Sequence, residues 1–287
     1  MPGKVPCGLV FFIFHMGKDV INRMDSEKKE GLSVCLLASG SRGNAVYVSN
    51  GSSAVLIDAG LSGIELQRRM TERNIDPESL DAIIVSHEHT DHIAAVGVLS
   101  RRFKLPVYIT PGTLAASEKK LGKLDRIVHF DCGGSFKVNS LTLHPFSISH
   151  DAQDPSGLTI LHKDTKVGIA TDLGVATSLV KTHLSGCHLV VLEANHDPQM
   201  LMQGDYPWPL KQRIKGRTGH LSNNDSRNLV TDIMHDDLSH IVLAHLSEEN
   251  NTPEKAMTTV GQAVNNTRTR LTLAVQEKST PVIHVKN

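Results

Sequence analysis

The strongest constraint on the fold of this chain is a cluster of metal-ligand side chains that directly follows a buried strand pattern. Residues 80–86 read LDAIIVS, which is typical of a strand buried on both faces, and HEHTDH comes next. Because the chain is still extended there, His87 and His89 point to the same side. Asp91 and His92 fall where a helical pattern begins, so a turn carries them to a neighbouring position. One segment can therefore supply two ligands to each of two metal ions, and the fold has to bring the remaining ligands from elsewhere.

Strand and helix patterns alternate along the rest of the chain, which predicts an α/β architecture with sheets covered by helices. Strand-like runs occupy residues 32–39, 45–49, 53–60, 80–86, 106–110, 141–149, 157–162, 166–172, 187–195, 240–247 and 271–278. Helical patterns occupy residues 62–74, 93–103, 177–186, 207–216, 223–235 and 253–264. Ser222 is a good N-cap for the fifth of these helices. Thr252 followed by Pro253 opens the last one in the same way.

Composition narrows the class of protein. Among the 287 residues, 30 Lys and Arg balance 30 Asp and Glu, so binding to nucleic acid would need a local basic patch. The cysteines (Cys7, Cys35, Cys132 and Cys187) are far apart and form no CxxC motif, which indicates reduced thiols in a cytoplasmic protein. No apolar run approaches the roughly 18 residues that span a bilayer, so we expect no membrane association.

The sequence changes in character at Leu32. Residues 1–31 contain a short apolar run, GLVFFIF, followed by a polar and charged stretch, whereas the strand patterns begin at Leu32. The apolar run has no small-residue cleavage site of the kind a signal peptide needs. We therefore expect residues 1–31 to be a dispensable extension, and residues 32–287 to form one catalytic domain.

Four further motifs place a ligand-type residue at the end of a predicted strand. They are LIDAG with Asp58, SISHDA with His150, IATDLG with Asp172 and AHLS with His245. With SHEHTDH, these motifs resemble, in order, the signature of the metallo-β-lactamase superfamily, and the resemblance covers about residues 32–286. It implies a four-layer αββα sandwich with the ligands on loops along one edge.

The resemblance also implies a ligand set for two divalent metal ions per chain. His87, His89 and His150 would bind one ion, Asp91, His92 and His245 would bind the other, and Asp172 would bridge them. Imidazole suits Zn²⁺, and the carboxylates also accept Mn²⁺. Two such ions can share a hydroxide that attacks phosphorus. Asp58 is expected to hold a ligand imidazole by its other nitrogen.

Longer runs resemble one branch of the superfamily, the YycJ family (also called WalJ or VicX). These runs are SGSRGN, EANHD, YPWPLKQRI, GHLSN and HLSEENN. The resemblance implies a metal-dependent phosphodiesterase, with a DNA exonuclease as the leading expectation and DNA favoured over RNA as substrate. An RNA-directed nuclease, a thioester or ester hydrolase of the glyoxalase II type, and a protein that only binds the metals are the alternatives. The oligomeric state stays open.

The same runs supply candidate catalytic and substrate residues. His220 corresponds to a histidine that contacts the scissile phosphate in related phosphodiesterases, and it joins Asp91 as a candidate catalytic residue. Glu193 and His196 either orient His220 or reach the metals.

A basic run precedes His220. Lys211 and Arg213 in this run are candidate phosphate contacts, and the neighbouring Trp208 is a candidate stacking partner for a base. The alternative is a solvated helix face with Trp208 as its buried anchor.

Overall fold

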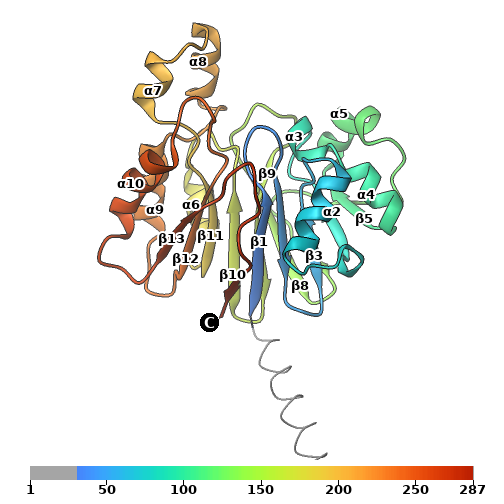
Figure 1. Ribbon diagram of the computed structural model, residues 1–287. Coiled ribbons are helices and arrows are strands. Elements are labelled where there is room, and N and C mark those ends of the chain that lie inside the picture. The colour runs from blue at the N-terminus through green and yellow to red at the C-terminus, as the bar shows by residue number, and fades with distance from the viewer. Residues whose placement is uncertain (1–30, 287) are drawn as a thin grey trace, which may run out of the picture.

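Two seven-stranded sheets face each other in the computed structural model, which describes residues 31–286 (Figure 1). The strand order in the first sheet is β14 (Ile283–Val285), β1 (Leu32–Ala38), β2 (Ala45–Ser49), β3 (Ala54–Ile57), β4 (Ala82–Ile84), β5 (Pro106–Ile109) and β6 (Arg126–His129). The order in the second sheet is β13 (Arg270–Leu273), β12 (His240–Ala244), β11 (Leu189–Glu193), β10 (Thr165–Ala170), β9 (Ser156–His162), β8 (Leu141–Ser147) and β7 (Phe136–Val138). Each half of the chain thus builds one sheet, and β14 returns to the first.

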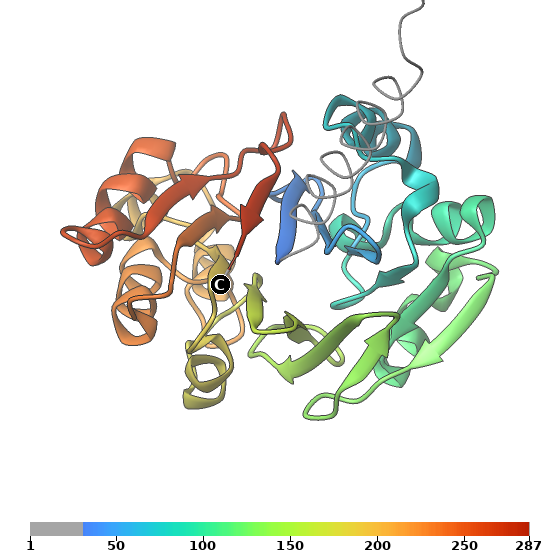
Figure 2. The same ribbon diagram turned by 90° about the horizontal axis from the view of Figure 1, so that it is seen from below.

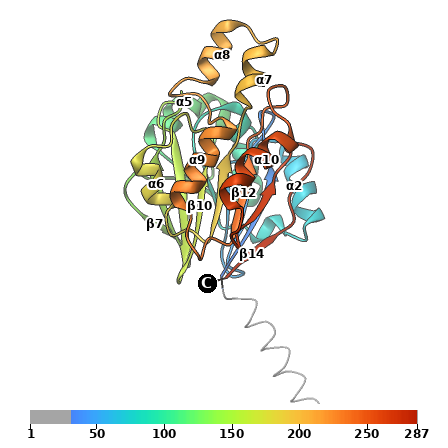
Figure 3. The ribbon, with the colours of Figure 1, turned by 90° about the vertical axis from the view of Figure 1, so that its left-hand side faces the viewer.

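Helices cover the outer face of each sheet, as the view from below shows (Figure 2). The first half of the chain contributes α2 (Gly63–Glu72), the 3₁₀ turn η1 (Pro77–Ser79), α3 (Thr90–Ile93), α4 (Val96–Phe103) and α5 (Pro111–Leu121). The second half contributes α6 (Ser178–Leu184), α9 (Asn223–Ile233) and α10 (Pro253–Val264). Two short helices, α7 (Pro198–Gln203) and α8 (Trp208–Ile214), project beyond the sandwich (Figure 3). The predicted αββα sandwich is confirmed.

The central strands are buried on both faces, which explains their unbroken apolar sequences. In β1, Val34 and Leu36 pack between the two sheets, whereas Cys35 and Leu37 pack under the helices. Alternate side chains of a strand point to opposite faces, so both sets must be apolar when both faces are covered. Polar side chains are therefore few in the central strands, and those of the predicted site lie where the strands end.

Most of the predicted elements are present, and the helix caps are confirmed. The Ser222 side chain accepts a hydrogen bond from the backbone N–H of Asp225 and forms a full capping box. The Thr252 side chain caps α10, with Pro253 at its first position. The sequence analysis missed the helices α5 and α7, the 3₁₀ turn η1, and the strands β6, β7 and β14. The three strands are short edge strands with exposed residues, and they carry little periodic signal.

Further predictions concern the N-terminal extension, the cysteines and membrane-spanning segments. Strand β1 begins at Leu32, while residues 1–30 lie outside the described part, so the extension and its dispensability stay a prediction. Of the cysteines in residues 31–286, Cys35 and Cys187 are buried free thiols and Cys132 is a partly exposed one. No helix in this part has the length and apolar character needed to cross a membrane.

Gly60 allows close backbone contact with the segments around Asn44 and Asp91, next to the His cluster. Its N–H donates to the Asn44 carbonyl, and a Cβ added at Gly60 would lie 1.5 Å from the Asp91 carbonyl oxygen. Only glycine allows such a close backbone approach. We expect Gly60→Ala to lower the free energy of unfolding by about 1–3 kcal/mol, as overpacking does.

Thermal or urea unfolding measures this effect, and Gly134→Ala is the matched control. A Cβ at Gly134 would lie no closer than 3.5 Å to its nearest neighbour. Equal stability of the two variants would contradict the argument.

Candidate metal centre

Three of the predicted site residues end strands in a left-handed backbone conformation. Their φ angles are 60° for Asp58 after β3, 58° for Asp172 after β10 and 56° for His245 after β12. Asp and His tolerate this conformation better than most residues, but it is uncommon outside glycine. Local strain of this kind persists where surrounding contacts hold it, and it gathers at functional sites. The fold therefore maintains three unusual turns along one edge of the sandwich.

Three imidazole nitrogens converge at this edge. The His89 Nδ1 atom lies 3.1 Å from His87 Nε2 and 3.2 Å from His150 Nε2. Nitrogen ligands that are 2.0–2.1 Å from a tetrahedral zinc ion lie roughly 3.3 Å from one another. The spacing of these three nitrogens thus suits a single ion.

A second donor group adjoins the first, and Asp172 lies between the two. The Asp91 Oδ2 atom lies 3.5 Å from His92 Nε2 and 3.8 Å from His245 Nε2. The Asp172 Oδ2 atom lies 3.3 Å from His92 Nε2. The Asp172 Oδ1 atom lies 3.5 Å from His245 Nε2 and 3.8 Å from His150 Nε2. The structure therefore brings together all seven residues of the predicted ligand set, with Asp172 next to both groups.

Two buried atoms at the centre test whether a cation fits. Asp172 Oδ2 and His245 Nε2 have no hydrogen-bond partner among the described residues. An unpaired buried polar atom is costly, and a buried charge more so. Burial would raise the pKa of Asp172, but the charges of His245 and His92 outweigh it and hold that pKa well below its usual range. A buried, ionised carboxylate among converging imidazoles is the donor set that a divalent metal ion requires.

Two buried carboxylates hold the imidazole rings from behind. Asp58 Oδ2 lies 2.8 Å from His92 Nδ1, and both Asp58 oxygens accept hydrogen bonds from Ser86. Glu193 Oε1 lies 2.8 Å from the Nδ1 atoms of both His220 and His245. Such contacts fix the tautomer and orientation of a ligand histidine.

Glu193 has no oxygen left for a further role. Its Oε2 atom accepts the backbone N–H groups of Leu173 and Leu221. Burial would raise the pKa of Glu193, but His220 and His245 lower it to about 2. Of the two alternatives for Glu193, the geometry favours orienting His220 over reaching a metal. His196 is buried, and its side chain belongs to none of the candidate donor groups within residues 31–286.

Several polar residues near the donors were not predicted from the sequence. The Asn44 Nδ2 atom lies 3.1 Å from Asp91 Oδ2 and 3.0 Å from His92 Nε2. The Ser39 side chain accepts the backbone N–H of His245. Both belong to the SGSRGN run, which entered the sequence analysis only through the family resemblance and without a role for either residue. A turn with two small polar residues directly after a buried strand was the available signal.

The projecting helices α7 and α8 correct one of the predicted substrate contacts. Lys211 is buried, and its Nζ atom donates to the carbonyls of Met202 and Gly204, so it joins the two helices and is not free to bind phosphate. Trp208 is 56% exposed, so the alternative of a buried anchor is wrong. Arg213 is exposed and pairs with Asp151 at 2.5 Å, directly beside His150.

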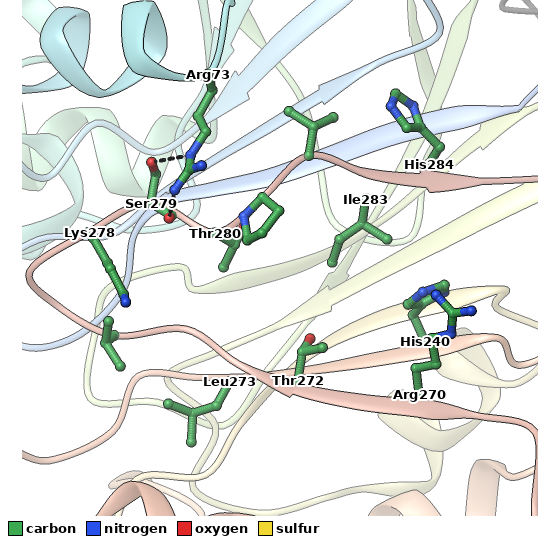
Figure 4. A pocket seen from close by; sticks show the side chains of 13 residues that line it. Arg73, His240, Arg270, Thr272, Leu273, Lys278, Ser279, Thr280, Ile283 and His284 are labelled. Carbon is green, nitrogen blue, oxygen red and sulfur yellow. Dashed lines mark hydrogen bonds between the residues drawn. The ribbon is translucent and has the colours of Figure 1, made fainter.

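A separate cavity of about 730 Å³ lies between the edge strands β13 and β14 (Figure 4). Arg270 and His240 lie at one end of it, and Lys278 and Arg73 at the other. None of the predicted site residues lines this cavity. The donor cluster is therefore not part of this cavity.

Two facing sheets with histidines and aspartates at the strand ends define a metal-dependent hydrolase fold, and comparison with known families agrees. The chain belongs to the metallo-β-lactamase superfamily, since the family model described as "Beta-lactamase superfamily domain" matches residues 53–246. The chain is therefore a hydrolytic enzyme, and its family implies divalent metal ions.

Within the superfamily the chain is similar to two named exodeoxyribonucleases. It is 36% identical to exodeoxyribonuclease YycJ of Bacillus anthracis over 236 residues, covering 82% of this chain and 89% of the relative. It is 38% identical to exodeoxyribonuclease WalJ of Streptococcus pneumoniae over 237 residues, covering 81% and 88%. Among solved structures, the metallo-β-lactamase fold protein YhfI of Bacillus subtilis superposes with a TM-score of 0.68 at 16% identity, covering 88% of this chain and 99% of YhfI. The resemblance to the YycJ family is confirmed, and the YhfI match supports the fold.

The double contact of Glu193 leads to a prediction on metal affinity. In Glu193→Gln, an amide NH₂ would replace one carboxylate oxygen. The NH₂ group would face either the backbone N–H groups of Leu173 and Leu221 or the two imidazole Nδ1 atoms, and it cannot accept a hydrogen bond in either place. We expect metal affinity to fall about 10- to 100-fold, the usual cost of removing a group that orients a ligand.

Competition with a chromogenic chelator measures this affinity. Glu248→Gln, which removes only an exposed partner of Arg42, is the control and should behave as the wild type. Unchanged affinity in Glu193→Gln would show that this carboxylate does not support the metal site.

Proposed function

We propose that this protein is a binuclear metal-dependent phosphodiesterase that degrades DNA from a strand end. The single observation that carries the proposal is the pair of adjacent donor groups with Asp172 close to both of them and the side chain of His220 close to Asp172. The names of the two relatives, which share most of their length with this chain, support DNA as the substrate.

We assign the donors as the sequence analysis did. His87, His89 and His150 would hold one ion, Asp91, His92 and His245 the other, and Asp172 both. Bound Zn²⁺ or Mn²⁺ supplies the Lewis acidity that polarises a phosphate ester and makes water a usable nucleophile at neutral pH. The remaining tasks, which are orienting the phosphate and protonating the leaving oxygen, fall to side chains of the protein.

His220 is placed to protonate the leaving oxygen. Its ring centroid lies 5.2 Å from those of both His150 and His245, and its side chain is 22% exposed. Nδ1 is committed to Glu193, so Nε2 is the ring nitrogen left for a substrate. Burial lowers the pKa of His220, but Glu193 outweighs this and raises the pKa above its usual value. A histidine fixed at one nitrogen and free at the other is a suitable general acid.

Cleavage assays test the proposal directly. The metal-loaded protein is incubated with end-labelled single- and double-stranded DNA and RNA, and with circular DNA of the same length. We expect mononucleotides to appear from one end of linear DNA, slower release from RNA, and no cut in the circle. Cleavage of the circle would indicate an endonuclease, and hydrolysis of thioesters without any cut in DNA would indicate the glyoxalase II type of activity.

The shared position of Asp172 leads to a prediction on metal content. We expect two metal equivalents per wild-type chain by elemental analysis, and the largest loss of metal among single ligand variants in Asp172→Ala, because this residue adjoins both donor groups. Asp164→Ala, an exposed turn residue, is the control. One equivalent or none in the metal-saturated wild type would refute the binuclear assignment.

His220 separates a phosphodiesterase from a protein that only binds metal. We expect His220→Ala to keep both metals and the fold while kcat on DNA falls by about 10²–10⁴, the usual contribution of general acid catalysis. The loss should shrink for a nitrophenyl phosphodiester, whose leaving group needs no proton. The exposed His284 on β14 provides the control substitution, His284→Ala. Loss of a metal in His220→Ala would make His220 a ligand, and full nuclease activity would remove it from the mechanism.

A further inference from the structure

Trp208 is the one tryptophan of the chain, and it is 56% exposed. A tryptophan side chain is usually largely buried, because its large apolar ring gains the most from leaving water. Trp208 instead begins α8 on the projecting pair of helices at the edge where the donors lie (Figures 1 and 3). The exposed ring of Trp208 therefore offers an aromatic face that a ligand can cover.

Lys215 already lies against this ring. Its Nζ atom is 5.0 Å from the ring centroid of Trp208, a cation–π contact. The two residues are seven apart, which places them on one face of the chain as it leaves α8. The contact restrains the ring and adds a positive charge beside it, while more than half of Trp208 stays accessible.

Hydrogen bonds and an ion pair fix this pair of residues relative to the donor cluster. Lys211 joins α8 to the end of α7, and Arg213 pairs with Asp151 next to His150. The backbone N–H of His220 donates to the Ile214 carbonyl at 2.8 Å. At 1.5 Å per residue, Trp208 lies about 9 Å along the helix from Ile214, which is close to the length of three stacked nucleotides at about 3.4 Å each.

The segment between Trp208 and His220 is positively charged. Arg213, Lys215 and Arg217 are exposed, and within residues 31–286 neither Lys215 nor Arg217 has a carboxylate partner. This contrasts with Arg42, which forms ion pairs with two glutamates. In a chain with no net charge, unpaired cations beside an exposed ring form a local site for an anionic partner that also has an aromatic face.

We propose that Trp208 and Lys215 form a platform on which one unpaired base near the end of a DNA strand stacks while Arg217 and Arg213 approach its phosphates. This inference rests on the proposed function. A base inside a duplex has both faces covered by its neighbours, whereas a base in a single strand offers a free face to an aromatic side chain. The enzyme therefore prefers single-stranded ends or overhangs to blunt duplex ends.

Binding without catalysis gives the first test. Single-stranded DNA carrying one 2-aminopurine at successive positions from the end is titrated with metal-free protein, and its fluorescence is recorded. We expect quenching at one position in the wild type, retention of this effect in Trp208→Phe, and its loss in Trp208→Ala. Ile64→Ala removes another exposed apolar side chain, on α2, and should quench like the wild type. No position-dependent quenching in the wild type would overturn the platform.

Kinetics of the metal-loaded enzyme give the second test. We expect Trp208→Ala to raise KM for single-stranded DNA about 5- to 150-fold, which is the usual effect of losing one base–aromatic stack. An abasic residue at the responding position should raise KM in the wild type by the same factor, and should add nothing further in Trp208→Ala. Additive effects would show that Trp208 and this base do not touch.

Three outcomes separate this proposal from its alternatives and from a failure of the proposed function. A change of sedimentation coefficient in Trp208→Ala would make the exposed ring a contact between copies of the chain and would overturn the platform. Cleavage of DNA by the wild type with an unchanged KM in Trp208→Ala would refute the platform and leave the proposed function intact. If the wild type degrades no DNA, the proposed function itself fails, whatever the fluorescence shows.

Discussion

A buried negative charge at Asp172 is the constraint on which the rest of the site depends. The residue is 2% exposed, and a carboxylate removed from water to that degree needs close positive or hydrogen-bonding partners. The side chains of His92, His150 and His245 surround it, and their own orientation depends on further buried groups. Asp58 holds one ring and Glu193 another, so the charge at the centre is stabilised through two layers of polar contacts. A partly satisfied buried network is costly, and within residues 31–286 the Asp172 Oδ2 and His245 Nε2 atoms at its centre have no hydrogen-bond partner, so they are the atoms that a bound cation would satisfy.

The architecture makes this concentration of polar groups possible. Because the central strands are largely apolar on both faces, they contribute burial along their whole length, and the polar side chains of the site lie at or beyond their last residues. Strands β10, β11 and β12 run parallel, so their carboxyl ends reach the same edge. Asp172, Glu193 and His245 come from these three ends and meet there. The stability of the core and the chemistry of the edge therefore depend on different residues of the same strands.

The strands could be predicted because they follow local apolar patterns, and the donor set was inferred because its motifs resemble those of a known superfamily. The unbroken apolar runs gave the strands, and Asp58, Asp172 and His245 each follow such a run directly. The role of Lys211 could not be predicted, since a lysine in a basic run looks the same whether its ammonium meets solvent or two carbonyls of a preceding helix. The position of Asn44 beside His92 depends on a contact between turns almost fifty residues apart, which no local pattern contains. Edge strand β14 was missed because three residues hold too little alternation to be recognised.

Glu193 connects the candidate acid to the candidate metal ligand. One oxygen of this carboxylate serves both His220 and His245, so a shift of either ring changes the hydrogen bond available to the other. Residues that share a partner in this way respond to substitution as a unit, and their separate effects do not add. Glu193, at the end of β11, thereby connects the metal donors to the segment from Trp208 to His220. That segment carries exposed cations and an exposed aromatic ring. Because the donor cluster alone fixes a reaction class and not a substrate, substrate choice is the role that we propose for that segment.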